Sequence, residues 1–550
     1  MNRLLLLTAA LGLALPSLAA PRQRYTIATD GTPRAAAMRI ATNAGNEEGS
    51  QHVRGFLTLN GFAADLTPEE AEALRGMAGV KAVDPVVERH AAAIDEPSLM
   101  QLASYAKQVT PWGLPAIHGR EVWPVTKGEG VNVVVLDSGI DLNHPDLKVA
   151  YVGGYNAIEQ GKPPSDDYFH GTHVSGTIAA TDNEFGTVGI APGVKLWAVK
   201  VLDQQGKGYD EQVATGLDWV IAKKRELGGP WVVNMSFGAA AEGGTLERAA
   251  VDRAIQEGII LIAATGNAGI STLDYPAKYP NVIPVGAMTP DATRADFSSY
   301  GGHMAVVAPG VALASTLPTE KLELSDILIN GQTFAAQGTI GSPKGTVTGK
   351  MVYCSGGRPS DFPATVRGNI ALVARDRDLA FREKARNAKE AGALAVVIFD
   401  NDPEVGPKLF TLLPRGCPGP DCGEEWNNYK FPLTLNVTYE DGQKLAALAN
   451  RDATVAFEFA RYGVYSGTSM AAPHATSVVA MMLSLNPTLM PSEVLRILRN
   501  TAVDVSAPGW DYETAWGMVD ALAAAQYVAP ERFGVPPPPT QYGRRRATRP

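Results

Sequence analysis

Short apolar runs rich in β-branched residues recur through the middle of the chain. They lie at 131–136, 194–201, 231–235, 259–264, 282–285 and 304–308. Continuous runs of this kind are typical of strands that are buried on both faces of a parallel sheet. Segments with helical periodicity lie between several of them, for example 212–227 and 245–257. The pattern therefore predicts an α/β domain from about residue 106, with its chemistry at the carboxyl ends of the strands.

The pattern in residues 21–105 is different and predicts a small α/β unit in front of that domain. Its strand-like stretches lie at 54–64 and 80–87. A helix is expected after Thr67, which is a favourable N-cap, and Pro68 fits the first helical position because its missing N–H is not needed there. Residues 91–106 have the character of a linker.

A second change of pattern, over residues 321–461, predicts an inserted β-rich domain. Its own strand signals lie at 349–353, 370–374 and 393–399, with a helix at 379–391. Without the insert, residues 106–320 and 462–528 have a size that is ordinary for one α/β domain.

The two ends of the chain predict export and an unstructured tail. Residues 1–20 have the charged start, apolar stretch and small-x-small cleavage site of a secretory signal peptide. No other apolar run approaches the roughly 20 residues that a membrane-spanning helix needs. We therefore expect a secreted protein, extracellular or periplasmic, that has no membrane as partner. The Pro/Arg-rich residues 529–550 are expected to be disordered.

Composition narrows the possible partners and the redox chemistry. The formal net charge of −9 over 550 residues disfavours nucleic acid and anionic membranes as general partners. We expect a monomer. The three cysteines are Cys354, Cys417 and Cys422. In an exported chain Cys417 and Cys422 are close enough in sequence to form a local disulfide, but the sequence leaves the pairing open.

Three motifs far apart in the chain carry groups that together could activate a nucleophile. Asp137 directly follows a predicted strand, in Asp-Ser-Gly, and His170 opens His-Gly-Thr-His. Ser469 lies in Gly-Thr-Ser-Met-Ala, just before an apolar run that predicts a buried helix. A hydroxyl at such a helix N-terminus still needs a base, and the base needs a third group to orient it. The chain order Asp, His, Ser is the order found in subtilisin.

These motifs are jointly similar to those of the subtilisin-like serine proteases, and the similarity runs over residues 107–320 and 462–528. The resemblance implies a three-layer α/β catalytic domain built on a parallel sheet. It also implies that Ser469 attacks the scissile carbonyl, that His170 moves the proton and that Asp137 orients the imidazole. The same motifs favour these residues over three nearby rivals, namely Asp141, His173 and Ser466.

The resemblance further implies an oxyanion donor and an extended peptide site. Asn267 follows an apolar strand and would supply a side-chain amide beside the backbone N–H of Ser469. Two segments would bracket a peptide as an added antiparallel strand, and one residue would lie at the rim of the primary pocket. The residues so implied are Ser236, Phe237, Gly238, Gly206, Gly208, Tyr209 and Ala268. We expect a preference for large apolar or aromatic residues before the cut.

A structural calcium site is implied by residues that align with the high-affinity calcium site of the family. The ligands would be the side chains of Gln108, Asp146 and Asn183 and the carbonyls of Thr181, Phe185 and Thr187. Ligation by oxygen atoms alone suits calcium. A solvated polar loop fits the composition equally well, so both readings stay open.

The insert resembles the protease-associated domain found inside some large secreted subtilases. The leading hypothesis is a secreted serine endopeptidase that hydrolyses protein or peptide substrates through an acyl-enzyme. It would be made as a zymogen, with residues 21–105 as a propeptide that inhibits the enzyme intramolecularly and is released by self-cleavage between about Ala91 and Lys107. The alternatives are an exopeptidase whose access the insert restricts, and an inactive scaffold that binds peptides.

Overall fold

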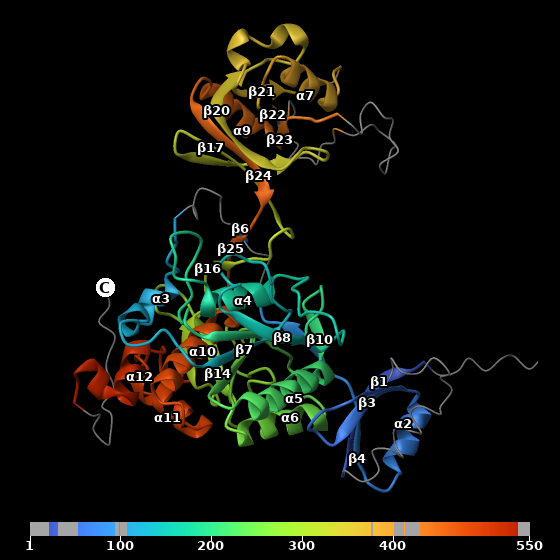
Figure 1. Cartoon of the computed structure of the whole chain (residues 1–550), viewed down its shortest axis with the longest axis vertical. Helices are drawn as coiled ribbons and strands as arrows, with labels where there is room; N and C mark the ends of the chain where they lie inside the picture. The colour runs from blue at the N-terminus through green and yellow to red at the C-terminus, as the bar shows by residue number, and fades with distance from the viewer. Residues whose placement is uncertain are drawn as a thin grey trace, which may run out of the picture.

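The structure is a computed structural model whose described residues form three lobes (Figure 1). The described residues are 21–30, 53–93, 98–99, 107–375, 378–400, 412 and 429–536. The predicted signal peptide, Cys417, Cys422 and residues 537–550 of the predicted tail lie outside them. We refer to the described parts of 21–93 as the N-terminal body, of 323–459 as the insert, and of 107–322 with 460–536 as the main domain.

Seven parallel strands form the central sheet of the main domain, in the order β15-β14-β13-β11-β7-β9-β8. Their bounds are β7 (Asn132–Asp137), β8 (Tyr151–Asn156), β9 (Lys195–Lys200), β11 (Trp231–Met235), β13 (Ile260–Ala264), β14 (Ile283–Met288) and β15 (Val306–Pro309). The predicted α/β class with a parallel sheet is confirmed. The pattern missed β8, because this edge strand is mostly half-buried and contains two glycines instead of a continuous apolar run.

Helices cover both faces of this sheet, which gives the expected three layers. Their bounds are α3 (Gly113–Ala116), α4 (His170–Ala179), α5 (Asp210–Leu227), α6 (Thr245–Gln256), α10 (Thr468–Leu485), α11 (Pro491–Thr501) and α12 (Ala521–Val528). Side chains alternate along β7: Val133 and Val135 pack on the face covered by α4 and α10, whereas Val134 and Leu136 pack against α5 and α6. The predicted tail is ordered at its start, because residues 530–533 form a short 3-10 helix whose Phe533 packs on the core.

An antiparallel sheet and one helix make up the N-terminal body. The sheet has the order β2-β3-β1-β4, with β1 (Gln23–Thr29), β2 (Val53–Gly55), β3 (Gly61–Leu66), β4 (Val80–Pro85) and the helix α2 (Pro68–Arg75). The predicted start of α2 is correct, since Thr67 and Glu70 form a reciprocal capping box. Where the pattern predicted a linker from residue 91, β5 (Glu88–Ala91) and β6 (Ser98–Leu99) pair with strands of the main domain.

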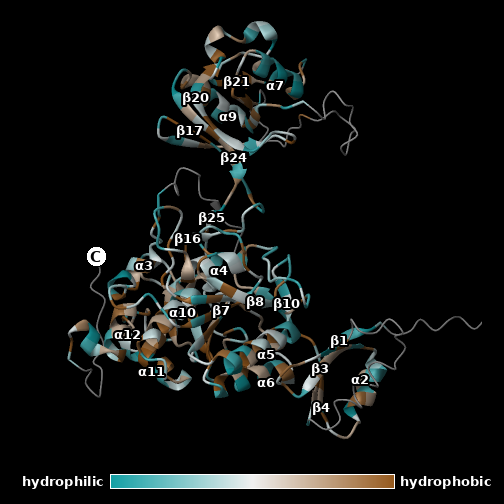
Figure 2. Cartoon of the chain, viewed as in Figure 1, coloured by the Kyte–Doolittle hydropathy of each residue, from teal (hydrophilic) through white to brown (hydrophobic). Residues whose placement is uncertain are grey.

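The insert is built on an eight-stranded sheet of its own, in the order β18-β17-β24-β20-β21-β22-β23-β19. The bounds are β17 (Glu323–Ile329), β18 (Gln332–Ala335), β19 (Gln337–Gly338), β20 (Gly345–Tyr353), β21 (Ile370–Ala374), β22 (Ala395–Phe399), β23 (Leu433–Val437), β24 (Asp452–Phe459), α7 (Phe381–Glu390) and α9 (Tyr439–Ala447). Figure 2 shows hydrophobic residues in the strands and mostly hydrophilic ones on α7. An antiparallel pair, β16 (Leu313–Thr316) and β25 (Tyr462–Tyr465), forms the neck to the main domain.

Two smaller findings bear on expectations from composition. Cys354 is a buried free thiol inside the insert, and burial raises its pKa to about 12. None of the helices in the described part of the chain has the length and apolar character needed to cross a bilayer.

Candidate active site

Asp137 and His170 meet at the carboxyl end of the central sheet. Asp137 is the last residue of β7, and His170 is the first residue of α4. The Oδ1 atom of Asp137 and the Nδ1 atom of His170 are 2.8 Å apart, and both side chains are fully buried. A carboxylate in this position holds the imidazole in the tautomer that leaves Nε2 as an acceptor. Within the described residues, Nε2 of His170 has no hydrogen-bond partner.

Ser469 lies in the first turn of α10, a helix that packs against α4. Its hydroxyl donates to the carbonyl oxygen of Ser236 over 2.7 Å, and no hydrogen bond to His170 is formed. The structure thus brings the acid and the imidazole into contact and leaves the hydroxyl engaged elsewhere. Transfer of the hydroxyl proton to His170 requires the side chain to turn away from Ser236. Hydrogen bonds of this kind often tighten only in the reacting complex.

The carbonyl oxygen of Ala92, just after β5, lies between two hydrogen-bond donors. The backbone N–H of Ser469 is 3.2 Å away, and Nδ2 of Asn267 is 2.6 Å away. The Asn267 amide is oriented by Thr468, whose N–H and hydroxyl both donate to its Oδ1 (2.9 and 2.8 Å). The Asn267 amide and the Ser469 N–H are therefore directed at the same oxygen atom.

The residues before Ala92 form an added antiparallel strand between two strands of the main domain. β5 pairs with β10 (Lys207–Tyr209) on one side and with β12 (Phe237–Gly238) on the other. The N–H of Ala91 donates to the carbonyl of Gly206 (2.9 Å), and that of Ala92 donates to the carbonyl of Ser236 (3.1 Å). Main-chain pairing of this type binds an extended peptide with little dependence on its sequence.

The predicted substrate-binding residues mostly lie along this strand. Those on β10 and β12 are Gly208, Tyr209, Phe237 and Gly238. Gly208 lets β10 lie close to the residues after β9, since a Cβ there would lie 2.1 Å from the carbonyl oxygen of Val201. Ala268 is exposed next to Asn267, and no hydrogen bond joins it to the strand among the described residues.

The three rival residues are engaged in other contacts. His173 has its Nε2 atom 3.1 Å from the carbonyl of Leu313, and burial, with His170 nearby, lowers its pKa to about 3. Asp141 accepts both the N–H and the hydroxyl of Thr319 (2.8 and 2.6 Å). The hydroxyl of Ser466 accepts a backbone N–H at 3.0 Å.

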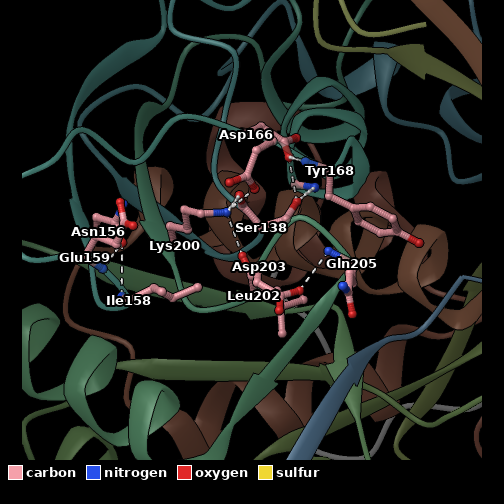
Figure 3. Close-up of polar contacts among 12 residues, drawn as sticks. Ser138, Asn156, Ile158, Glu159, Asp166, Tyr168, Lys200, Leu202, Asp203 and Gln205 are labelled. Carbon is pink, nitrogen blue, oxygen red and sulfur yellow. Dashed lines mark hydrogen bonds and ion pairs between the residues drawn. The ribbon is translucent and has the colours of Figure 1, made fainter. Parts of the chain in front are cut away.

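A buried polar network that the sequence did not suggest ties the Asp137 strand to the His170 helix (Figure 3). Ser138 donates its hydroxyl to Asp166 (2.9 Å) and accepts the N–H of Gly171 (2.9 Å). Asp166 also accepts the N–H and hydroxyl of Thr172, and burial raises the pKa of Asp166 although these bonds oppose the rise. Lys200 donates to the carbonyl of Ser138 at 2.7 Å. The sequence feature that points to this network is the pair of adjacent aspartates, including Asp166, shortly before His170.

The six residues of the predicted calcium site lie together beside Tyr462; they are Gln108, Asp146, Thr181, Asn183, Phe185 and Thr187. The Asp146 carboxylate is fully buried and accepts from Asn183 Nδ2 (2.7 Å) and the Tyr462 hydroxyl (2.8 Å). The Gln108 amide is 3.1 Å from the carbonyl of Thr181. Among the described residues no lysine or arginine pairs with Asp146, and no cluster of three or more His, Cys, Asp or Glu side chains occurs. The groups that meet the Asp146 carboxylate are donors, so a calcium ion would fit here with the Asn183 and Gln108 amides turned to present their oxygens.

The subtilase family matches residues 128–346 and 441–517, which is more than half of the chain. The chain belongs to the subtilase family. Within it, subtilisin NAT from Bacillus subtilis subsp. natto is 39% identical over 283 residues, covering 50% of this chain and 68% of the relative. Subtilisin from Bacillus pumilus is 43% identical over 221 residues, covering 38% of this chain and 76% of the relative.

The remaining comparisons account for the other two lobes of this subtilase. A PA domain matches residues 347–445, and a peptidase inhibitor I9 domain matches residues 36–92. The crystal structure of fervidolysin from Fervidobacterium pennivorans, described as a keratinolytic enzyme related to subtilisin, has the same fold. Its TM-score is 0.57 at 23% identity, covering 93% of this chain and 62% of that one. The chain is thus a serine protease of the subtilase family, with an inhibitor-type propeptide and an inserted PA domain.

Proposed function

We propose that the chain is a secreted endopeptidase that hydrolyses peptide bonds through an acyl-enzyme on Ser469. The observation that carries this proposal is the carbonyl oxygen of Ala92, which accepts from the N–H of Ser469 and from Asn267. A scissile carbonyl needs such a position, because the negative charge of the tetrahedral intermediate then develops next to donors that are already oriented.

The path of the chain on either side of Ala92 favours an endopeptidase over an exopeptidase. Before Ala92, residues 88–91 pair with β10 and β12. After it, residues 98–99 pair with β25. A peptide can therefore run through the site without presenting either of its ends to the cleft.

The reaction follows from the roles proposed for four side chains. The Oγ atom of Ser469 forms a bond to the scissile carbonyl carbon while Nε2 of His170 takes the hydroxyl proton. Asp137 stabilises the imidazolium, and Asn267 with the Ser469 N–H holds the oxyanion. His170 then gives the proton to the leaving amine as the C–N bond breaks. A water molecule, deprotonated by His170, releases the acyl group and regenerates Ser469.

The N-terminal body acts as an intramolecular inhibitor in this proposal, and the bond it presents is Ala92–Ala93. This bond lies within the range expected for self-cleavage, and the inhibitor domain ends at residue 92. After the cut, the strand that ends at Ala92 stays in the cleft as a bound product. The enzyme is therefore made as a zymogen whose activity appears when the N-terminal body leaves.

A fluorophosphonate probe combined with N-terminal sequencing tests this proposal. We expect the wild type to be labelled and to begin at Ala93, and Ser469→Ala to be unlabelled and uncut, since loss of such a nucleophile costs about 10⁶-fold in kcat. Ser466→Ala is the matched control and should behave as the wild type. Maturation of Ser469→Ala, expressed alone, to the same N-terminus would show that self-cleavage is wrong. Failure of the matured wild type to take the label would refute the enzyme itself.

Calcium is proposed as a structural ion, held by Asp146 and the amide and carbonyl oxygens around it. A bound ion would cross-link the loop 181–187 to the segment near Gln108 and stabilise the fold without taking part in the reaction. At a calcium concentration about 100 times its Kd, the gain is about 2.7 kcal/mol. We expect a chelator to lower the melting temperature of Ser469→Ala protein, and Asn183→Ala to abolish that shift. An unchanged melting curve with chelator would exclude the site.

A further inference from the structure

Arg89 is a buried cation in the strand that occupies the cleft. Counted back from the Ala92–Ala93 bond it is the fourth residue, and its exposed fraction is 0%. An arginine is almost never fully buried unless a partner compensates its charge. The expectation of large apolar residues before the cut therefore does not describe this strand, which carries Ala92 at the cut and Arg89 at the fourth position.

The partner of Arg89 is Glu247 of α6. The Nη2 atom of Arg89 is 2.5 Å from Oε2 of Glu247, and its Nε atom is 3.4 Å from Oε1. Nη1 donates to the carbonyl of Ala241 at 3.1 Å. Three nitrogens of one guanidinium are thus bound by groups of the main domain. The planar fork of arginine matches a carboxylate in this two-point way, whereas the point charge of lysine does not.

The walls of the pocket are shaped around this pair. Glu247 lies in the first turn of α6, where the helix N-terminus favours a carboxylate, and the hydroxyl of Tyr279 is 3.4 Å from its Oε2 atom. Gly243 leaves the space that the pair fills. A Cβ at this position would lie 1.5 Å from Oε2 of Glu247 and 2.7 Å from Nη2 of Arg89.

Arg89 stabilises the charged form of the carboxylates around it. Burial raises the pKa of Glu247 to about 7, and Arg89 opposes that rise. Burial also raises the pKa of Asp210 and of Asp274, and the same guanidinium opposes both rises. A neutral side chain in the pocket would remove this cation, and Glu247 would then take up a proton and lose the two-point ion pair, so the site complements a cation.

From these observations we infer that the pocket holding Arg89 selects arginine at the fourth position before the scissile bond. Glu247 is then the residue that determines specificity. This inference rests on the proposed function, since it assigns to substrates the place that the strand of the N-terminal body occupies. Protein substrates of this enzyme would carry arginine four residues before the cut and a small residue next to it.

Four internally quenched peptides test the inference with the matured wild-type enzyme. They share the sequence of residues 88–96 and differ only at the fourth position before the cut, which is arginine, citrulline, lysine or leucine. We expect kcat/KM for the arginine peptide to exceed that for citrulline and leucine about 10–100-fold, because the ion pair and its hydrogen bonds are lost. Lysine should fall between them.

Glu247→Gln keeps the shape of the side chain and removes its charge. In this variant the arginine peptide should lose about 10–100-fold in kcat/KM, and the leucine peptide should change little. Equal cleavage of all four peptides by the wild type would overturn the inference and leave Arg89 as an anchor of the N-terminal body only. The peptide series alone decides this if the variant fails to fold. Cleavage of none of the peptides, with no fluorophosphonate label, would instead refute the proposed function and this inference with it.

Discussion

The N-terminal body and the insert are attached to the main domain in different ways. From the N-terminal body, Arg24 makes two hydrogen bonds of 2.8 Å to Glu211, and the chain at residues 57–58 donates to Asp218 of α5. The hydrogen bonds and ion pairs found among the described residues of the insert join residues of the insert to each other, as in Lys344–Glu323. The insert connects to the main domain through the neck of β16 and β25 (Figure 1).

This difference in attachment indicates which role each lobe can have. The N-terminal body covers α5 and α6 with hydrogen bonds and with Ala28, Phe56 and Leu59, which join the hydrophobic cluster of these helices, and its last strand ends beside the Asn267 amide. It is therefore suited to hold its last strand in place. The insert has hydrophobic clusters of its own, so it packs as a separate domain that the catalytic geometry does not need.

The largest effect is expected where the N-terminal body is held by a buried carboxylate. Asp218 is almost fully buried and accepts the N–H of Leu57 and the N–H and hydroxyl of Thr58. Removing it in Asp218→Ala should speed release of the cut N-terminal body about 10–100-fold, because hydrogen bonds to a charged group are worth about 1.5–3 kcal/mol. The measurement is the lag before peptide hydrolysis begins. Glu226→Ala, on the exposed side of the same helix, should leave the lag unchanged. An equal lag in both variants would mean that Asp218 is no anchor.

An intermediate effect on stability is expected when the pH is lowered. It should destabilise the main domain and leave the insert unaffected. Burial lowers the pKa of His474 to about 4 and, with His170 nearby, that of His173 to about 3, whereas the unfolded chain titrates near 6.5. Stability is therefore full above about pH 6.5 and is lost as pH falls through this window. At pH 5 each of these two histidines lowers the free energy of unfolding by about 2 kcal/mol relative to its value above pH 6.5. The insert contains no histidine and escapes this loss.

Urea unfolding of Ser469→Ala protein at pH 7.5 and pH 5 measures this loss. Tryptophan fluorescence follows the main domain, since seven of the eight tryptophans lie outside residues 323–459. His474→Gln should reduce the pH-dependent loss by about 2 kcal/mol. A loss that is the same in the variant and the parent would contradict the neutral, buried state of His474.

The smallest effect is expected from removal of the insert. Ser325 of β17 and Phe457 of β24 are opposite each other in an antiparallel pair, so residues 326–456 can be replaced by an Asn-Gly turn. The shortened enzyme should cut short peptides with kcat/KM within about threefold of the parent, because the domain packs on its own core. The same assay on an unfolded protein reports whether the insert restricts larger substrates. A loss of more than about tenfold on short peptides would show that the insert supports the site.

Part of the fold and site could be predicted because some signals are local. A strand that is buried on both faces, such as β7 or β11, must be a continuous apolar run. The helix cap at Thr67 depends on only four consecutive residues. The motifs around Asp137, His170 and Ser469 are local in the same sense. β8 was missed because an edge strand has no such run. β5 was missed because its partners lie more than a hundred residues further along the chain.

The sequence by itself determined the α/β class, the three-part organisation, and the acid, imidazole and hydroxyl that the motifs single out. Only the tertiary structure decided which distant groups contact each other. It put the Ala92 carbonyl between Ser469 and Asn267, and it paired Arg89 with Glu247 across 158 residues. The physical reason is that the burial of a strand and the capping of a helix depend on residues that are adjacent in the sequence. An ion pair or an added strand instead forms between residues that only the folding of the whole chain brings together. The sequence around one partner does not indicate which residue is the other.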